Sequence, residues 1–265
     1  MAPLFFIHGM LSSARIWDDF RDYFQGLGYR CHAPSLPQHF TANQASDVAG
    51  LSLKDYRHSL ESAYRQLDEA PVLIGHSMGA LLAQQLASQK RPKAMILLAP
   101  APSAGVTLFH QDACRTLLKP LSTPMYWRKG FKPSLSAASF GLFNGIPQEQ
   151  HAHLYDQLCY ESGKSLFEIA MWYLDRNQEA RVDAELIDCP VLTLVGDEDR
   201  LTSVSSCKRI SEQFSGTSHF HSLSGAGHWL PKAANWQSIA RQIHVWLCWQ
   251  QGLQPRLIDA QAGCS

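Results

Sequence analysis

The chain has 265 residues, of which 45% are hydrophobic and 17% charged, so it is long enough for one large α/β domain or for a core with an inserted subdomain. Its 23 basic and 23 acidic side chains give a formal net charge of zero, a balance that favours neither nucleic acid nor an anionic membrane surface as a partner. No apolar run approaches the roughly 20 residues that span a bilayer.

The cysteines and histidines bear on location and on metal binding. The seven cysteines are scattered and form no C-x-x-C pair, which favours free thiols in a reducing compartment. The first eight residues lack the basic region of a signal peptide, and the 12 histidines include no H-E-x-x-H pattern. We therefore expect a cytoplasmic protein, a monomer or weak dimer, that uses no metal and no cofactor.

The first part of the chain alternates apolar runs with amphipathic stretches. The apolar run at 3–7 predicts a buried strand. The elements expected after it are a helix over 14–27, a strand over 29–33, a loop over 34–50 and a helix over 53–68.

The stretch from 70 to 89 has the most specific pattern. A short apolar run ends in Gly75-His76-Ser77-Met78-Gly79, and a helix-forming run follows without a gap. This strand, turn and helix is the context that G-x-S-x-G requires in order to present a serine as a nucleophile. Because the Met78 N–H would lie at a helix N-terminus, it would also stabilise a developing negative charge.

The alternation stops after one more strand, expected over 93–99. From 103 to 187 the sequence shows only helical patterns and breakers, with helices expected over 108–118, 134–140, 147–159 and 164–174. This insertion leaves the sheet at the carboxyl end of one strand and returns before the next. We therefore expect a mobile helical lid over Ser77 whose apolar inner face selects the substrate.

The alternation resumes with a strand over 190–195, a helix over 204–214, a strand over 219–223 and a helix over 236–249. Such a rhythm predicts an α/β fold, with a mostly parallel central sheet and helices on both faces. We expect residues 1–102 and 188–251 to form the core, 103–187 the cap, and 252–265 a flexible tail.

Three expected strand ends carry Ser77, Asp199 and His228. A serine needs a base to accept its proton, histidine can take that proton and return it near neutral pH, and a carboxylate orients the imidazole. The carboxyl ends of parallel strands meet at one edge of a sheet, where ligands bind. Asp197 competes with Asp199 for the acid position.

The sequence resembles the α/β-hydrolase family over nearly its whole length. Four motifs occur in family order: His8-Gly9-Met10, Gly75-His76-Ser77-Met78-Gly79, Gly196-x-x-Asp199 and Gly227-His228-Trp229. The resemblance implies Ser77 as nucleophile, His228 as base and Asp199 as acid, because the family's acid is usually the third residue after the glycine. It also implies the backbone N–H groups of Met10 and Met78 as the oxyanion hole, and the insertion as the family's cap domain.

A wider set of residues is expected around the pocket, namely His8, Gly9, His76, Trp127, Phe143, Trp172 and Trp229. Of these, we expect His8 and His76 chiefly to pack against the turns and to form hydrogen bonds there. The loop that often reads D-x-P-G-x-G in relatives is here Ser35-Leu36-Pro37-Gln38-His39-Phe40, and His39 has no assigned role.

The favoured function is hydrolysis of carboxylic esters, lactones or thioesters through an acyl-enzyme, with a small-molecule substrate and no nucleic-acid or membrane partner. An enzyme of the same fold that hydrolyses C–C bonds, or a cofactor-free lyase, is the alternative, motivated by the aromatic cap and the 38–40 loop. A small-molecule receptor on a hydrolase scaffold is a more remote alternative.

Overall fold

The computed structural model describes residues 1–40, 42–107, 111–250, 252 and 254–255, and for Leu118 the backbone alone. The start of the first expected cap helix, at 108–110, lies outside the described residues. So does most of the expected tail, namely 253 and 256–265.

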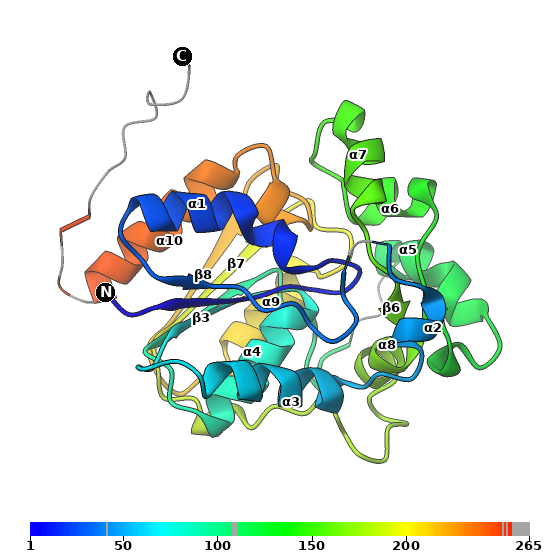
Figure 1. Ribbon diagram of the computed structural model, residues 1–265, viewed down its shortest axis with the longest axis horizontal. Helices are drawn as coiled ribbons and strands as arrows, with labels where there is room; N and C mark the ends of the chain where they lie inside the picture. The colour runs from blue at the N-terminus through cyan, green and yellow to red at the C-terminus, as the bar shows by residue number, and fades with distance from the viewer. Residues whose placement is uncertain (41, 108–110, 251, 253, 256–265) are drawn as a thin grey trace.

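A six-stranded parallel sheet forms the centre of the molecule (Figure 1). Its strands, in the order in which they lie side by side, are β2 (Cys31–His32), β1 (Leu4–Ile7), β3 (Val72–His76), β4 (Ala94–Leu98), β7 (Val191–Gly196) and β8 (Ser218–Leu223). The four inner strands are buried at every residue. Strands covered on both faces read as continuous apolar runs, which is why the sequence identified them. The predicted parallel sheet is confirmed.

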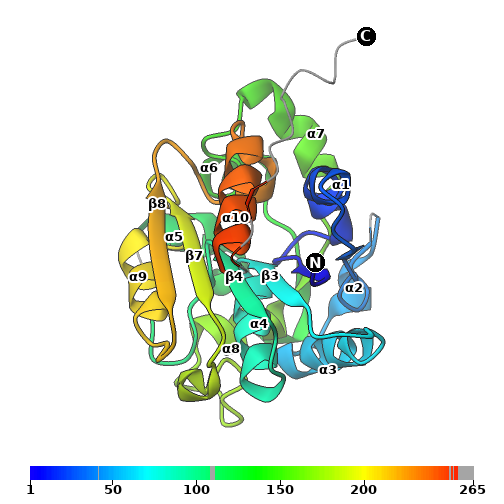
Figure 2. The same ribbon diagram turned by 90° about the vertical axis from the view of Figure 1, so that its left-hand side faces the viewer.

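Helices cover both faces of the sheet, as expected (Figures 1 and 2). One face carries α1 (Asp18–Gly26) and α10 (Trp236–Gln250), and the other carries α3 (Leu53–Tyr64), α4 (Met78–Gln89) and α9 (Val204–Ser211). The expected 14–27 helix is divided, because Ala14–Trp17 form a 3-10 turn before α1. Within the described ranges, no helix has both the length and the apolar character needed to cross a bilayer.

Aromatic packing fixes α1 against the start of the sheet. The Phe6 ring lies 5.1 Å from that of Trp17 and 6.2 Å from that of Phe24, and Phe20 lies 5.8 Å from Trp236 of α10. Large buried aromatic side chains contribute much of a core's stability. This packing holds the end of β1, where the chain turns at His8 toward the candidate site.

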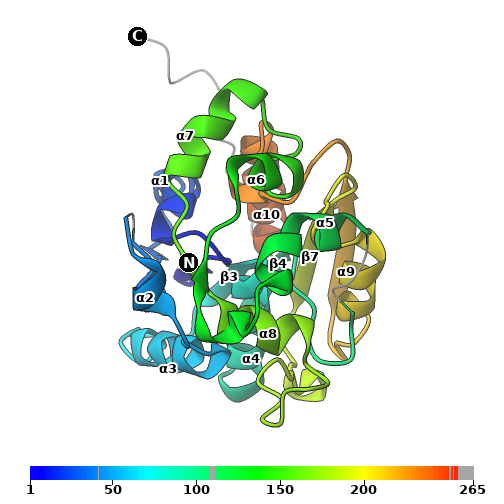
Figure 3. The ribbon, with the colours of Figure 1, turned by 90° about the vertical axis from the view of Figure 1, so that its right-hand side faces the viewer.

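The described residues of the segment 103–187 lie over the carboxyl ends of the strands (Figure 3). Its elements are α5 (Gln111–Ser122), η2 (Tyr126–Arg128), β5 (Gly130–Phe131), α6 (Leu135–Gly141), η3 (Gln148–Gln150), α7 (His151–Asp156), β6 (Glu161–Ser162), α8 (Gly163–Ala170) and η4 (Ala184–Leu186). The sequence indicated only helices here, whereas β5 and β6 pair antiparallel. Strands of two residues are too short to show a period of two.

Several other boundaries differ from expectation. The expected loop 34–50 contains a one-turn helix, α2 (Ala45–Val48), which begins where the Asp47 carboxylate accepts a hydrogen bond from the Gln44 N–H at 2.7 Å. The expected 164–174 helix ends at Ala170. Residues 171–174 form turns, so the apolar positions 172–174 do not continue the helix face.

The second half of the segment 103–187, the expected cap, is tied to the rest of the fold by buried polar contacts. Glu168 on α8 accepts a hydrogen bond from the Leu53 N–H at 2.7 Å, where it satisfies one of the free N–H groups that begin α3. Asn43 donates to the Tyr160 carbonyl oxygen at 3.1 Å and accepts from the Tyr160 N–H at 2.7 Å. These contacts join the segment around β6 and α8 to the core.

Replacing Glu168 with Gln is expected to stabilise the protein at alkaline pH. Burial raises the pKa of Glu168 to about 7, and this effect outweighs the Leu53 N–H and Lys164, which act to lower the pKa. A raised carboxyl pKa gives stability that is complete below the unfolded value and is lost as pH rises through the folded value. Glu168→Gln should therefore raise Tm by about 2–6 °C near pH 8 and change it little near pH 5. Thermal unfolding followed by circular dichroism checks this, and an equal shift at both pH values would contradict it.

Candidate active site

Ser77 stands on a strained turn between β3 and α4. Its backbone has φ 54° and ψ −121°, a conformation rare outside glycine that is tolerated where surrounding structure enforces it. The two glycines of the motif are needed because the turn is tight. A Cβ on Gly75 would lie 2.5 Å from Ala80 Cα, and one on Gly79 would lie 2.5 Å from the His8 carbonyl oxygen. The strand, turn and helix expected from the sequence are thus present.

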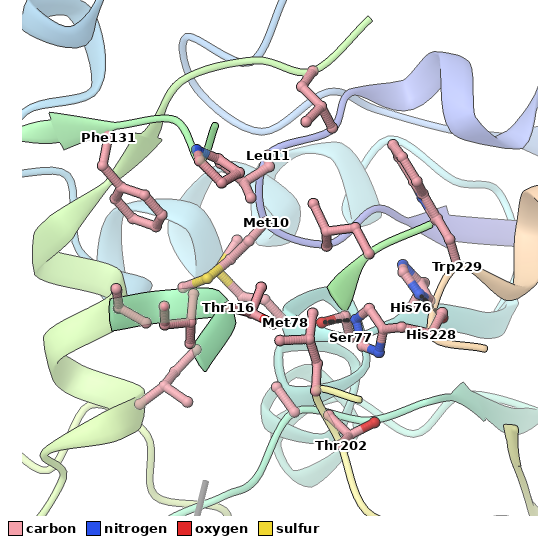
Figure 4. Close-up of a pocket in the computed structure, with 18 residues that line it drawn as sticks. Met10, Leu11, His76, Ser77, Met78, Thr116, Phe131, Thr202, His228 and Trp229 are labelled. Carbon is pink, nitrogen blue, oxygen red and sulfur yellow. Dashed lines mark hydrogen bonds between the residues drawn. The ribbon is translucent and has the colours of Figure 1, made fainter. Parts of the chain in front are cut away.

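A chain of hydrogen bonds connects three side chains from three strand ends. Ser77 Oγ lies 3.1 Å from His228 Nε2, and His228 Nδ1 lies 2.8 Å from Asp199 Oδ2. These residues follow β3, β8 and β7 respectively, and Figure 4 shows Ser77 and His228 facing each other. The structure therefore brings together the three side chains for which the sequence predicts the roles of nucleophile, base and acid.

Asp199 is held as a carboxylate. Burial alone would raise its pKa, but His228 and the surrounding donors outweigh burial and lower it. Those donors are the Leu201 N–H at 2.7 Å, the Thr202 N–H at 2.8 Å and the Thr202 hydroxyl at 2.8 Å. Since donors fill its remaining lone pairs, the carboxylate is fixed in the orientation that contacts His228.

Asp197, the competing acid candidate, lies elsewhere. Its carboxylate is exposed and accepts a hydrogen bond from the Gly225 N–H at 2.8 Å, within the turn after β8. The interaction with His228 is made by Asp199. The carboxylate in contact with His228 is thus the one at the third position after Gly196.

Two further histidines, His8 after β1 and His76 at the end of β3, are neutral. Burial and nearby histidines lower the pKa of both His8 and His76 to about 3. His76 Nε2 donates to the His228 carbonyl oxygen at 2.9 Å, which requires a proton on Nε2. His8 Nε2 accepts from the Leu36 N–H at 2.9 Å, so the proton of His8 is on Nδ1. Both histidines hold the backbone around the site, as the sequence predicted.

A pocket opens next to Ser77, and the empty space within it is about 750 Å³ when the open solvent at its mouth is included. In Figure 4 it extends from Ser77 and His228 toward Phe131. The described lining consists of Met10, Leu11, His76, Ser77, Met78, Ala101, Thr116, Leu117, Phe131, Pro133, Leu142, Leu158, Leu166, Ile169, Leu201, Thr202, His228 and Trp229. None of these described lining residues is Asp, Glu, Lys or Arg.

The predicted pocket residues divide into two groups. His76 and Trp229 belong to the described lining, and so do Met10 and Met78, whose N–H groups were expected to form the oxyanion hole. His8 and Gly9 lie behind the lining, where a Cβ on Gly9 would be 2.9 Å from Ser77 Cβ. Glycine is therefore needed at position 9 because a side chain there would collide with Ser77.

The three cap aromatics predicted for the pocket lie outside its described lining. Phe143 is fully buried and stacks on Trp229, with ring centroids 4.7 Å apart, so it supports the wall from behind. Trp127 is 41% exposed and packs against Phe167. Trp172 follows the end of α8 and packs edge-on against Tyr173. Their positions depend on how short helices pack, which aromatic content alone does not specify.

The cap contributes mainly aliphatic groups that the sequence analysis did not single out. Thr116 and Leu117 come from α5, Phe131 from β5, and Leu166 and Ile169 from α8. The spacing of Leu166 and Ile169 places them on one helix face, which is the one signal in the sequence that could have identified them.

The 38–40 loop does not supply a reactive group to the pocket. His39 is 1% exposed, and its Nε2 lies 3.0 Å from Glu161 Oε2. Gln38 and Phe40 also lie outside the described lining, and Phe40 is 50% exposed. The loop that helped to motivate a C–C hydrolase or lyase therefore adds no group to the described lining. Across the described ranges, no three His, Cys, Asp or Glu side chains gather closely enough to hold a metal ion.

A parallel sheet that presents a serine on a strained turn, with histidine and aspartate at neighbouring strand ends, defines the class of α/β proteins with a nucleophile elbow. Within that class, the model of the alpha/beta hydrolase family matches residues 4–240. The chain belongs to the alpha/beta hydrolase family, which confirms the resemblance seen in the sequence.

Curated relatives match only part of the chain. The human and mouse proteins named ABHD8 are each 33% identical to it over 87 residues, which is 32% of this chain and 20% of ABHD8. The match therefore spans about a fifth of the length of these relatives.

Solved structures resemble the chain over most of its length. A monoacylglycerol lipase from Paleococcus ferrophilus has a TM-score of 0.72 at 20% identity, covering 94% of this chain and 96% of that one. A putative lipase from Acinetobacter baumannii has a TM-score of 0.71 at 20% identity, covering 96% and 85%. The Arabidopsis methylesterase MES16 has a TM-score of 0.69 at 14% identity, covering 93% and 99%. At these identities the likeness shows a shared fold.

Proposed function

We propose that the protein hydrolyses carboxylic esters, including lactones or thioesters, through an acyl-enzyme on Ser77. The observation that supports this most directly is the hydrogen-bond chain from Ser77 through His228 to Asp199, with distances of 3.1 and 2.8 Å, at the end of an apolar pocket. A buried ionised carboxylate, a histidine and a strained serine at hydrogen-bond distance form the arrangement that activates a hydroxyl for acyl transfer.

The chemistry follows from the position of each group. Ser77 Oγ attacks the acyl carbon while His228 Nε2 accepts its proton, and Asp199 stabilises the resulting imidazolium. The negative charge forms on the former carbonyl oxygen, where the Met10 and Met78 N–H groups would donate to it. The imidazolium then protonates the departing alcohol, and an acyl-enzyme remains. Water, deprotonated by His228, attacks the ester carbon and releases the acid and free Ser77.

The described lining indicates which esters fit. A pocket lined by aliphatic side chains and methionine stabilises apolar groups by removing their surface from water, whereas a charged group there would lose its hydration without a counter-charge. We propose that the substrates carry uncharged, apolar acyl or alkyl groups. A series of p-nitrophenyl esters tests this. Butyrate and hexanoate esters should turn over much faster than the succinate half-ester, whose acyl group is charged, and equal rates would contradict the proposal.

The cap would then set chain-length preference from the far end of the pocket. Phe131 is half-buried and lines the pocket opposite Ser77. Replacing Phe131 with Ala should lengthen the best acyl chain by about two to four carbons, because removal of an aromatic ring leaves space that a longer chain fills. Comparison of kcat/KM across esters of increasing length measures this shift.

Trp172 provides the matched control for Phe131. It is a half-buried cap aromatic that lies outside the described lining, so Trp172→Ala should leave the chain-length profile unchanged. A shift of equal size in both variants would show that the profile responds to general loosening of the cap. The mobility of the lid stays a prediction.

A further inference from the structure

A buried carboxylate lies beneath the turn that follows β1. Glu161, on the cap strand β6, is fully buried, and five donors surround its two oxygens. Oε1 is approached by Tyr56 Oη at 2.7 Å, Ser162 N at 2.7 Å and Ser165 Oγ at 3.1 Å, and Oε2 by His39 Nε2 at 3.0 Å and Leu11 N at 3.3 Å. Buried charges are costly unless donors and a counter-charge compensate them. So complete a set of partners holds the carboxylate in one orientation.

His39 supplies the counter-charge. Its Nδ1 lies 2.8 Å from the Pro37 carbonyl oxygen, which can only accept, and its Nε2 faces the carboxylate. Both ring nitrogens therefore act as donors, which describes an imidazolium. The direction of the pKa shifts agrees. Burial would lower the pKa of His39 and raise that of Glu161, but their mutual interaction outweighs burial and reverses both shifts.

The carboxylate clamps a strained residue beside the expected oxyanion hole. Leu11 has φ 63°, which is unfavourable for a residue with a branched side chain. Cap residues hold both of its backbone polar groups. Its N–H donates to Glu161 Oε2, and its carbonyl oxygen accepts from the Cys159 N–H at 2.8 Å. Strained backbone persists where surrounding structure over-determines it, and here that structure belongs to the cap.

We propose that Glu161, paired with His39, is a positioning residue that fixes the Leu11 peptide and thereby aims the Met10 N–H into the oxyanion hole. This inference rests on the proposed function. The Leu11 N–H and the Met10 N–H belong to the two peptide units that meet at Met10 Cα, so holding the first restricts the Met10 φ and ψ angles that direct the second. The cap therefore has a second part in the reaction besides shaping the pocket, because it holds the donor that stabilises the tetrahedral intermediate.

The test is the isosteric variant Glu161→Gln. Each carboxylate oxygen accepts from one backbone N–H, that of Ser162 or that of Leu11. A glutamine amide has only one acceptor oxygen, so in either orientation its NH₂ group opposes one of these N–H groups. Hydrolysis of p-nitrophenyl butyrate should show kcat lowered by about 10- to 100-fold with KM changed by less than about threefold, because the oxyanion donor acts in the transition state.

A tetrahedral adduct gives a second readout that a merely structural role would not change. An alkyl trifluoromethyl ketone forms a hemiketal with Ser77 whose oxyanion occupies the same hole. Its inhibition constant should rise in Glu161→Gln by about the factor that kcat/KM falls. The control is Glu168→Gln, a second buried cap glutamate that contacts the backbone of α3 and not the turn. In this control kcat and the inhibition constant should stay within about twofold of wild type.

Three outcomes decide the inference. A folded Glu161→Gln protein with wild-type kcat and wild-type inhibition constant overturns it. If this variant does not fold, His39→Gln decides. Loss of the counter-charge should lower kcat severalfold at unchanged KM, and an unchanged kcat overturns the proposal. If the wild-type protein hydrolyses no ester at all, the proposed function fails first. A wild-type enzyme that turns over esters and is insensitive at Glu161 removes only the positioning role.

Discussion

Replacing Ser77 with Ala is expected to lower kcat for p-nitrophenyl butyrate by about 10⁴- to 10⁶-fold, because the variant has no nucleophile and only binding and oxyanion stabilisation remain. Ser77 Oγ lies 3.1 Å from His228 Nε2, so the hydroxyl is the group from which His228 takes a proton. Initial rates with purified protein, measured to the detection limit, provide the comparison.

The Ser77 variant should remain folded. Alanine removes one hydroxyl from the lining of the pocket and leaves the turn glycines in place, so Tm should change by only about 2–4 °C. A protein without activity that unfolds cooperatively with a Tm in this range supports Ser77 as the nucleophile. Activity within about tenfold of wild type would exclude Ser77 from that role, because a triad nucleophile contributes far more.

Replacing Asp199 with Asn should lower kcat by about 10⁴-fold. Asp199 Oδ1 accepts from the Leu201 and Thr202 N–H groups, and Oδ2 accepts from the Thr202 hydroxyl and contacts His228 Nδ1 at 2.8 Å. An asparagine whose oxygen accepts from the two backbone N–H groups presents its NH₂ group to His228. The imidazole then carries its proton on Nε2, where it cannot accept one from Ser77.

Asp197→Asn is the matched control, two residues away on the same loop. Its carboxylate contacts the Gly225 N–H, which an asparagine oxygen can also do, so kcat should stay within about twofold of wild type. Equal losses in the two variants would indicate a loop that tolerates no change, and a larger loss at Asp197 would assign the acid to that residue.

The sequence was most informative where local pattern and fold coincide. The buried strands were recognisable because both faces of a parallel sheet are covered, which makes its strands continuous apolar runs. The G-x-S-x-G motif was recognisable because a side chain at either glycine would collide with the backbone of α4 or of the end of β1. The positions of Asp199 and His228 followed from two further strand ends. In these places a few neighbouring residues specify the geometry.

The pocket wall and the Glu161 pair depend on packing between distant segments. Glu161 lies 150 positions from Leu11 and 122 from His39, and nothing in its sequence neighbourhood distinguishes it from a solvent-exposed glutamate. Trp172 was expected in the pocket as one of the aromatic residues of the cap, within a helix over 164–174 that in the structure ends at Ala170. A boundary error of one turn changes which side chains face inward.

The most direct test of the acyl-enzyme is mass spectrometry of wild-type protein quenched in acid within milliseconds of mixing with p-nitrophenyl butyrate. We predict a mass increase of one butyryl group, located on the peptide that contains Ser77, together with a burst of p-nitrophenol equal to the enzyme concentration. Steady turnover with no acyl group on that peptide, or with the acyl group on another residue, would contradict the proposed mechanism.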